Sequence, residues 1–123
     1  MCPVYINRIA SIHAESRNEK PYFSAQEPDY KEMITNANLR RRMSRMIKMG
    51  VACGLECLKD IPSEKVDAII TATGLGCLAD TEKFMNALMD NREQMLNPTA
   101  FIQSTFNTVG AQLALLLKIH AYN

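Results

Sequence analysis

Tryptophan is absent from this chain of 123 residues, and neither sign of charge is in excess, since the net charge at pH 7 is +1. A nearly neutral chain has no global field that would favour nucleic acid or a membrane surface as its partner. The first residues lack the basic region and long apolar stretch of a secretory signal. The four cysteines are therefore expected to be free thiols in a reducing cytoplasm: Cys2, Cys53, Cys57 and Cys77.

Long apolar runs and common ligand motifs are also missing. The uncharged stretch 96–117 is broken by asparagine, proline and glutamine, which argues against a membrane span. Neither GxGxxG nor the P-loop pattern occurs, so no nucleotide phosphate site is predicted. Cys53 and Cys57 lie four residues apart, but a zinc site would need two more ligands from Cys77, His13 or His120, without any metal-type spacing. We interpret both thiols as core or near-core groups and predict no metal and no cofactor.

The composition that is present predicts a packed domain. Hydrophobic residues make up 47% of the chain, and eight of them are methionine, which indicates an adaptable, helix-rich core. A chain of this length forms one domain or part of one and can bury a substantial core.

One stretch, residues 66–81, organises the rest. Its first part, 66–73, is apolar and β-branched apart from one aspartate, and predicts a buried strand. Gly74-Leu75-Gly76 then predicts a sharp turn. Asp80 or Thr81 is expected to cap a helix that starts near Glu82 and runs to Asp90. Strand, glycine turn and helix in this order are where an α/β protein usually binds a ligand.

The flanking segments complete an α/β prediction. Residues 3–12 alternate loosely and predict a first strand, while 13–38 predicts a long irregular loop with at most a helical turn near 30–34. The helical periodicity over 39–60 predicts one long helix, in which Gly50 and Gly54 let another segment come close.

The last third of the chain predicts the most apolar helix. Residues 97–99 predict a turn, and 100–102 a brief extended piece. Ser104 or Thr105 is expected to cap a helix that runs to about His120 and is apolar almost all round, so more than one neighbour must bury it. The predicted fold is therefore a short mixed sheet with three main helices.

Three segments, taken in order, resemble the N-terminal part of the β-ketoacyl-acyl carrier protein synthases, which are condensing enzymes of the thiolase fold. The resemblance implies that residues 1–123 form the N-terminal part of a thiolase-like domain. The segment LNPTAFIQST (96–105) most resembles the corresponding segment of the divergent synthases of bacterial polyene-pigment and related lipid pathways. The matching segments are RRRMSRMIKMGVACGLECLKD (40–60), DAIITATGLGCL (67–78) and LNPTAFIQSTFNTVGAQLALLLKI (96–119).

The resemblance also implies what the chain does not carry. In the family, the nucleophilic cysteine ends the strand after the third helix, and two histidines or their equivalents follow later; no position here matches any of the three. Cys77 lies near a helix start, where the pKa of a thiol can fall, and His13 or His120 would have to supply a base. We interpret Cys77 as a packed thiol of the turn, so no catalytic residue is predicted.

Several site residues are implied by the resemblance. The position of Leu75 helps to close the acyl pocket, and the segment of Ala100 and Phe101 reaches the pocket of a partner subunit across a dimer. Arg41 and Arg42 match basic positions that dock the acidic acyl carrier protein. The alternative to a docking role is that these arginines form a solvated helix face. The alternative to a ligand-binding role for Gly74 and Gly76 is a purely structural turn.

Three hypotheses about function follow. The first is a portion of a condensing enzyme of fatty acid or polyketide type, inactive alone. The second is a non-catalytic module that docks carrier protein or pairs, as a homodimer or heterodimer, with a full-length synthase. The third is an RNA-binding basic helix, which the near-neutral charge and the lack of aromatic residues among the arginines make least favoured. Acyl chain length and the oligomeric state are not indicated by the sequence.

Overall fold

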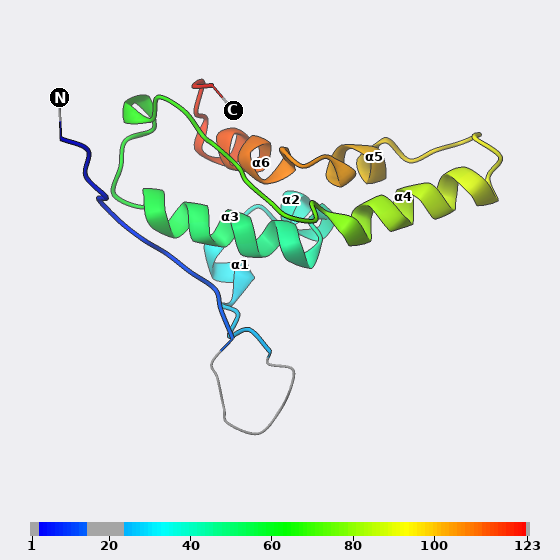
Figure 1. Ribbon diagram of the computed structural model, residues 1–123, viewed down its shortest axis with the longest axis horizontal. Helices are drawn as coiled ribbons and strands as arrows, with labels where there is room; N and C mark the ends of the chain where they lie inside the picture. Colours follow the sequence, from blue (N-terminus) through cyan, green and yellow to red (C-terminus); the bar gives the residue numbers. More distant parts are fainter. Residues whose placement is uncertain (1–2, 15–23, 123) are drawn as a thin grey trace.

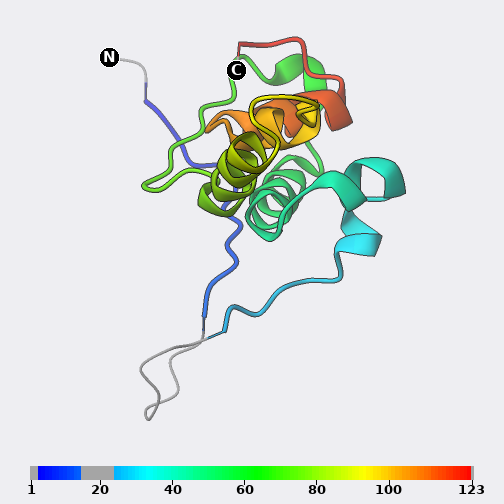
Figure 2. The same ribbon diagram turned by 90° about the vertical axis from the view of Figure 1, so that its right-hand side faces the viewer.

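The chain is helical in the part that the structure, a computed structural model, describes, namely residues 3–14 and 24–122. Figure 1 shows two rows, with α3 and α4 in one row and α6 and α5 lying along them, and Figure 2 shows the same stack turned by 90°. The helices are α1 (Tyr30–Met33), α2 (Ala37–Arg42), α3 (Arg45–Leu58), α4 (Leu78–Asp90), α5 (Pro98–Ser104) and α6 (Thr108–Leu117), with a 3-10 turn, η1 (Ser63–Lys65).

Three short helices begin at side chains that cap them. Asp29 accepts a hydrogen bond from the backbone of Lys31 at the start of α1, within the predicted helical turn of the long loop. Asn36 accepts from the backbone N–H groups of Asn38 and Leu39 and so starts α2. Asn97 accepts from the backbone of Thr99, and Pro98 takes the first helical position of α5. Asparagine and aspartate caps, and proline at the first position, are typical helix starts.

The prediction of one helix over 39–60 is wrong, because the chain breaks between α2 and α3. Met43 and Ser44 adopt extended conformations, with ψ of 133° and 170°. The break leaves the carbonyl of Arg42 outside a helical ladder, and the Gln103 side chain donates a hydrogen bond to it. Met43 is only 4% exposed. The burial of Met43 and the hydrogen bond from Gln103 therefore stabilise the interruption between the two helices.

The predicted boundaries of the later helices are also wrong. α4 starts at Leu78 with Cys77 as its N-cap, so Asp80 and Thr81 lie inside the first turn and do not cap it. The piece 100–102, predicted to be extended, is helical within α5 because Asn97-Pro98 starts a helix there. The last helix starts at Thr108, and Lys118, with φ of 54°, ends it before His120.

The predicted mixed sheet is not found in residues 3–14 and 24–122. Two isolated bridges occur there, an antiparallel one between Ala14 and Ala25 and a parallel one between Ala68 and Tyr122. In the second, the backbone N–H of Ile69 donates to the carbonyl of Tyr122 at 2.8 Å. The segments 3–13 and 66–73 are otherwise without a ladder partner in this part of the chain, so they do not form the predicted strands.

The core gathers around α3 and takes residues from α6, from the ends of α1 and α2, and from Cys77. α6 packs against α3 on one side, while a Cβ on its Gly110 would lie 2.9 Å from the Thr71 hydroxyl on the other. The prediction that this apolar helix is buried by more than one neighbour is thus confirmed, although Leu115 is 60% exposed. The buried cluster consists of Ile34, Met43, Ile47, Val51, Cys77 and Leu113.

Candidate functional site

The glycine turn joins the extended segment 66–73 to α4. Gly76 has a φ of +64°, a left-handed conformation that glycine adopts without strain. The backbone N–H of Gly76 donates to the hydroxyl of Thr73 at 3.0 Å, which closes the turn. A Cβ on Gly74 would meet nothing within 4 Å, so the turn is open on that side. The predicted turn is confirmed, and only Gly76 is required by its conformation.

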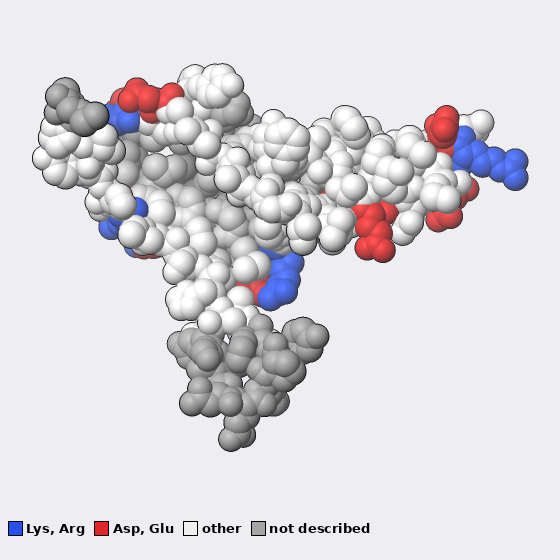
Figure 3. All heavy atoms as spheres, viewed as in Figure 1, with Lys and Arg blue, Asp and Glu red and all other residues white. Residues whose placement is uncertain are grey.

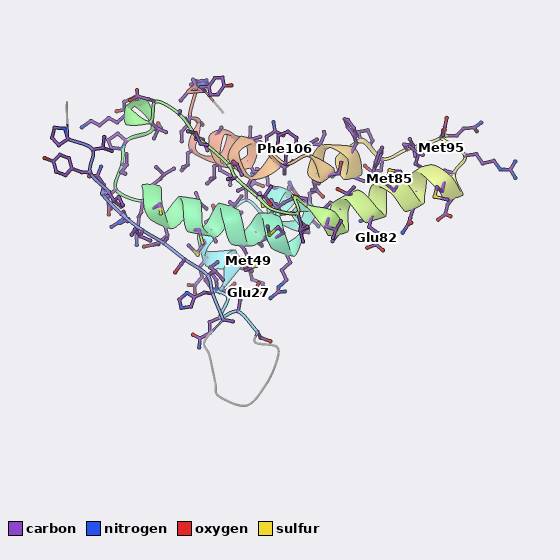
Figure 4. The ribbon with its side chains drawn as sticks, viewed as in Figure 1. Glu27, Met49, Glu82, Met85, Met95 and Phe106 are labelled. Carbon is purple, nitrogen blue, oxygen red and sulfur yellow. The ribbon has the colours of Figure 1, made fainter. Side chains whose placement is uncertain are left out.

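An open depression of about 540 Å³ lies beside this turn. The hydroxyl of Thr81 ties its two walls together, since it lies 3.2 Å from the carbonyl of Cys77 and 3.4 Å from that of Ser104. Leu75 is 78% and Phe106 is 74% exposed, so two apolar side chains of the lining are open to solvent. Figure 4 shows Phe106 at the start of α6. The lining residues are 71–77, Thr81, Ser104 and Phe106.

Cys77 lies in the wall of this depression as a buried thiol. It is 5% exposed, and burial, together with the nearby carboxylate of Asp80, raises the pKa of the thiol. A raised pKa keeps the group protonated near neutral pH, and a protonated thiol is a poor nucleophile. Neither His13 nor His120 is among the residues that line the depression. The interpretation of Cys77 as a packed thiol agrees with this environment.

Of the three residues with implied roles in acyl binding, one lines the depression at the glycine turn. Leu75 lines the depression, but Ala100 and Phe101 lie on α5 and are not part of its lining. The ring of Phe101 packs against that of Phe84 on α4, with centroids 5.4 Å apart, and Phe101 remains 56% exposed. Phe106 was not predicted to line this depression, because its position two residues before the start of α6 gave no motif signal for it; the resemblance implied only that residues around 106–117 face a second subunit.

The basic residues of α2 and α3 differ in what they contact. The Arg41 guanidinium donates to the side chain of Asn38 at 2.6 Å, and Arg40 donates to the carbonyl of Ile34 at 2.5 Å. Arg45 forms an ion pair with Glu27. Arg41 and Arg42 are exposed, and among the described residues no hydrogen bond or ion pair engages the Arg42 guanidinium. Glu27, which sequence reasoning did not single out, is thus part of this basic region.

The two cysteines of α3 do not form a metal centre in the described ranges. Cys53 and Cys57 are both partly buried, and burial raises the pKa of the Cys53 thiol. No group of three or more histidine, cysteine, aspartate or glutamate side chains gathers there to hold a metal ion.

Within residues 3–14 and 24–122, no single helix has the length and apolar character needed to cross a membrane. The pair α5 and α6 would reach that length and composition together, but its axis is bent by 107° at the break.

The family model for the β-ketoacyl synthase N-terminal domain matches residues 13–121, which is most of the chain. A search of curated proteins gave no match. The chain belongs to the β-ketoacyl synthase family.

Proposed function

We propose that this chain is the N-terminal portion of a β-ketoacyl-acyl carrier protein synthase-like protein that does not run the condensation by itself. One observation carries the proposal: in a member of the synthase family, an open depression with Leu75 and Phe106 in its lining lies at the glycine turn, without an activated nucleophile beside it in the described residues. Acyl transfer needs a nucleophile, a base within hydrogen-bond reach and an oxyanion site. The chain would then supply binding surface, while the catalytic groups lie elsewhere.

The acyl chain is proposed to lie against the rim formed by Leu75 and Phe106. Both side chains are largely exposed in this chain, and apolar surface of that kind is stabilised when a hydrocarbon chain covers it. Binding sites for small apolar ligands are typically depressions with an apolar lining and a few polar groups. Here the hydroxyl side chains of the lining are Thr71, Thr73, Thr81 and Ser104.

A second subunit, another copy or a full-length synthase, is proposed to cover the outer face of α4, α5 and α6. Figure 3 shows that the surface over α5 and α6 is largely uncharged on the side in view. Groups of exposed apolar side chains are typical of association sites. In such a dimer, Ala100 and Phe101 would reach the pocket of the partner. The exposed apolar side chains are Leu78, Met85, Met89, Phe101, Ile102, Phe106 and Leu115.

Acyl carrier protein is the proposed partner of the basic surface. Arg41 and Arg42 are exposed on α2, which the Asn36 cap and the bond from Gln103 hold in place. Such a preformed surface also supports the second candidate function, a non-catalytic module that docks carrier protein without the rest of a synthase. We further propose that the protein belongs with the synthases of polyene-pigment pathways and that it is located in the cytoplasm.

Binding and transfer by the purified chain test this proposal. Mixed with a type II acyl carrier protein in its acylated form, the chain should bind it without forming an acyl-enzyme visible by mass spectrometry. Reversing Arg41 and Arg42 to glutamate should weaken binding by about tenfold or more, whereas reversing Lys59 and Lys65, an equal change in net charge, should not.

Two results would contradict the proposal. An acyl group found on one of the cysteines would overturn the inactivity of the chain. RNA binding that is salt-sensitive and that carrier protein does not displace would favour the basic-helix alternative.

A further inference from the structure

Glu27 binds Arg45, the first residue of α3, through one carboxylate oxygen and Tyr30, the first residue of α1, through the other. Its Oε1 accepts from Nε of Arg45 at 2.6 Å and lies 2.5 Å from Nη2, and its Oε2 accepts from the hydroxyl of Tyr30 at 2.6 Å. Glu27 belongs to the segment before α1, eighteen residues from Arg45. Figure 4 shows Glu27 beneath α3, near the point where the chain returns toward α1.

The local charges favour this contact at neutral pH. The hydrogen bond from Tyr30, then the bond and charge of Arg45 and the charge of Lys48, lower the pKa of the Glu27 carboxyl. Glu27 therefore stays ionised. Burial, and then the neighbouring carboxylate, raise the pKa of Tyr30, so its hydroxyl stays a donor. Charge-assisted hydrogen bonds of this kind are short and directional.

The contact balances the charge of one cation in the basic region of α2 and α3, which also contains Arg41 and Arg42. Arg45 lies a few residues further along the chain, at the start of α3, and its side chain is 67% exposed even while it is paired. An acidic partner that approaches this surface would meet an arginine whose charge is already balanced. It would have to exchange its own carboxylate for that of Glu27.

We propose that Glu27 is a built-in competitor for the acidic carrier protein and that the segment 24–29 weakens docking by withholding Arg45. This inference rests on the carrier-docking function proposed above and adds its regulation. Tyr30 is a positioning residue here, since it orients the Glu27 carboxylate and does not touch the partner. Release of Glu27 would add Arg45 to the docking surface without any change in the fold of α3.

The test is a titration of the full chain with a purified type II holo-acyl carrier protein at two salt concentrations. Glu27→Gln should tighten binding by about threefold, the scale of one exposed ion pair, and more so at low salt. Glu32→Gln is the matched control, because it makes the same change in net charge on exposed α1, where Glu32 has no ion pair with a described residue. Equal effects of the two variants would overturn the proposal, since only general electrostatics would then be at work.

A second pair of variants separates Arg45 from the rest of the surface. With Arg45→Gln already present, Glu27→Gln should have no effect beyond that of Glu32→Gln, and Tyr30→Phe in the natural chain should give part of the gain. A full gain that persists without Arg45 would overturn the mechanism. Circular dichroism of each variant controls for folding.

The result also separates this inference from the docking function itself. Binding that needs Arg41 and Arg42 but ignores Glu27 would overturn only the regulation. If neither the natural chain nor Glu27→Gln binds the carrier protein, both proposals are wrong.

Discussion

Gly54 of α3 lies against Leu113 of α6 so closely that an added Cβ would be 2.4 Å from Leu113 Cδ1, 2.7 Å from Cδ2 and 3.1 Å from Cγ. Leu113 is 6% exposed and belongs to the buried cluster, so its isobutyl group has little room to move away. The contact explains why a glycine stands in the middle of α3, where glycine costs helix stability relative to alanine. Close packing of the two helices depends on it.

We expect Gly54→Ala to destabilise the chain by about 1–3 kcal/mol, because the added methyl group overpacks the core between α3 and α6. Urea unfolding monitored by circular dichroism measures the change. Gly74→Ala is the matched control, since a Cβ there meets nothing within 4 Å. A Gly54→Ala chain as stable as Gly74→Ala would show that α6 can shift freely.

Gly76→Ala should lower the free energy of unfolding by about 1–2 kcal/mol, because a residue with a Cβ is strained at the left-handed φ of +64°. Gly76→Asn should cost less, since asparagine tolerates this conformation better than alanine. Unfolding measurements on the two variants test this order. The reverse order would show that the turn relaxes to a negative φ.

Leu75 and Phe101 should affect different properties, because only Leu75 lines the depression. We expect Leu75→Asp to reduce the preference of the chain for acylated over holo-carrier protein. Phe101→Asp should instead lower self-association, measured by analytical ultracentrifugation. Loss of acyl preference in both variants would indicate that a partner brings Phe101 into the same pocket.

The Cys77 thiol should react slowly with iodoacetamide near neutral pH in the folded chain and readily in urea. Burial and the Asp80 carboxylate raise its pKa, so little thiolate is present. Mass spectrometry of the peptide containing Cys77 measures the rate. Since the folded pKa lies above the unfolded one, the stability linked to this group is present below the unfolded pKa and is lost as the pH rises through the folded value. Rapid modification in the folded state would contradict this account.

The Glu27 carboxyl should titrate below its usual value of 4.5, because Tyr30 and Arg45 both favour the ionised form. Its contribution to stability is therefore present above 4.5 and is lost as the pH falls through the lower, folded value. NMR titration of the side-chain carboxyl measures the midpoint. Arg45→Gln should move the midpoint upward, and an unchanged midpoint would mean that Tyr30 alone holds the carboxylate.

Some features of this fold follow from local patterns, while others depend on distant contacts. The glycine turn and the apolar character of α6 were predictable, since each rests on neighbouring residues. The break at Met43 and Ser44 was not, because the apolar spacing continues through it and the hydrogen bond from Gln103 comes from far along the chain. The start of α5 at Asn97-Pro98 was a readable cap signal that the turn interpretation missed.

The candidate site divides in the same way. Leu75 was implied by the family resemblance and Cys77 was considered because it follows the glycine turn, whereas Phe106 comes from the connection between α5 and α6. The ion pair of Glu27 and Arg45 joins two segments whose charges are unremarkable when each is considered alone. A single sequence contains no local signal for such a contact. The sheet prediction failed in the described residues because an apolar, β-branched segment specifies an extended backbone but not its partner.

The bridge between Ala68 and Tyr122 has a consequence for the order of folding. Closing it brings together positions roughly fifty residues apart, at an entropic cost that local helical contacts do not carry. The packing of α4 against α5 needs only the short connection between them. We therefore expect pulse-labelled hydrogen exchange to show early protection in α4 and late protection at Ile69. The extended segment 66–73 would then be the last part of the described chain to acquire its native contacts.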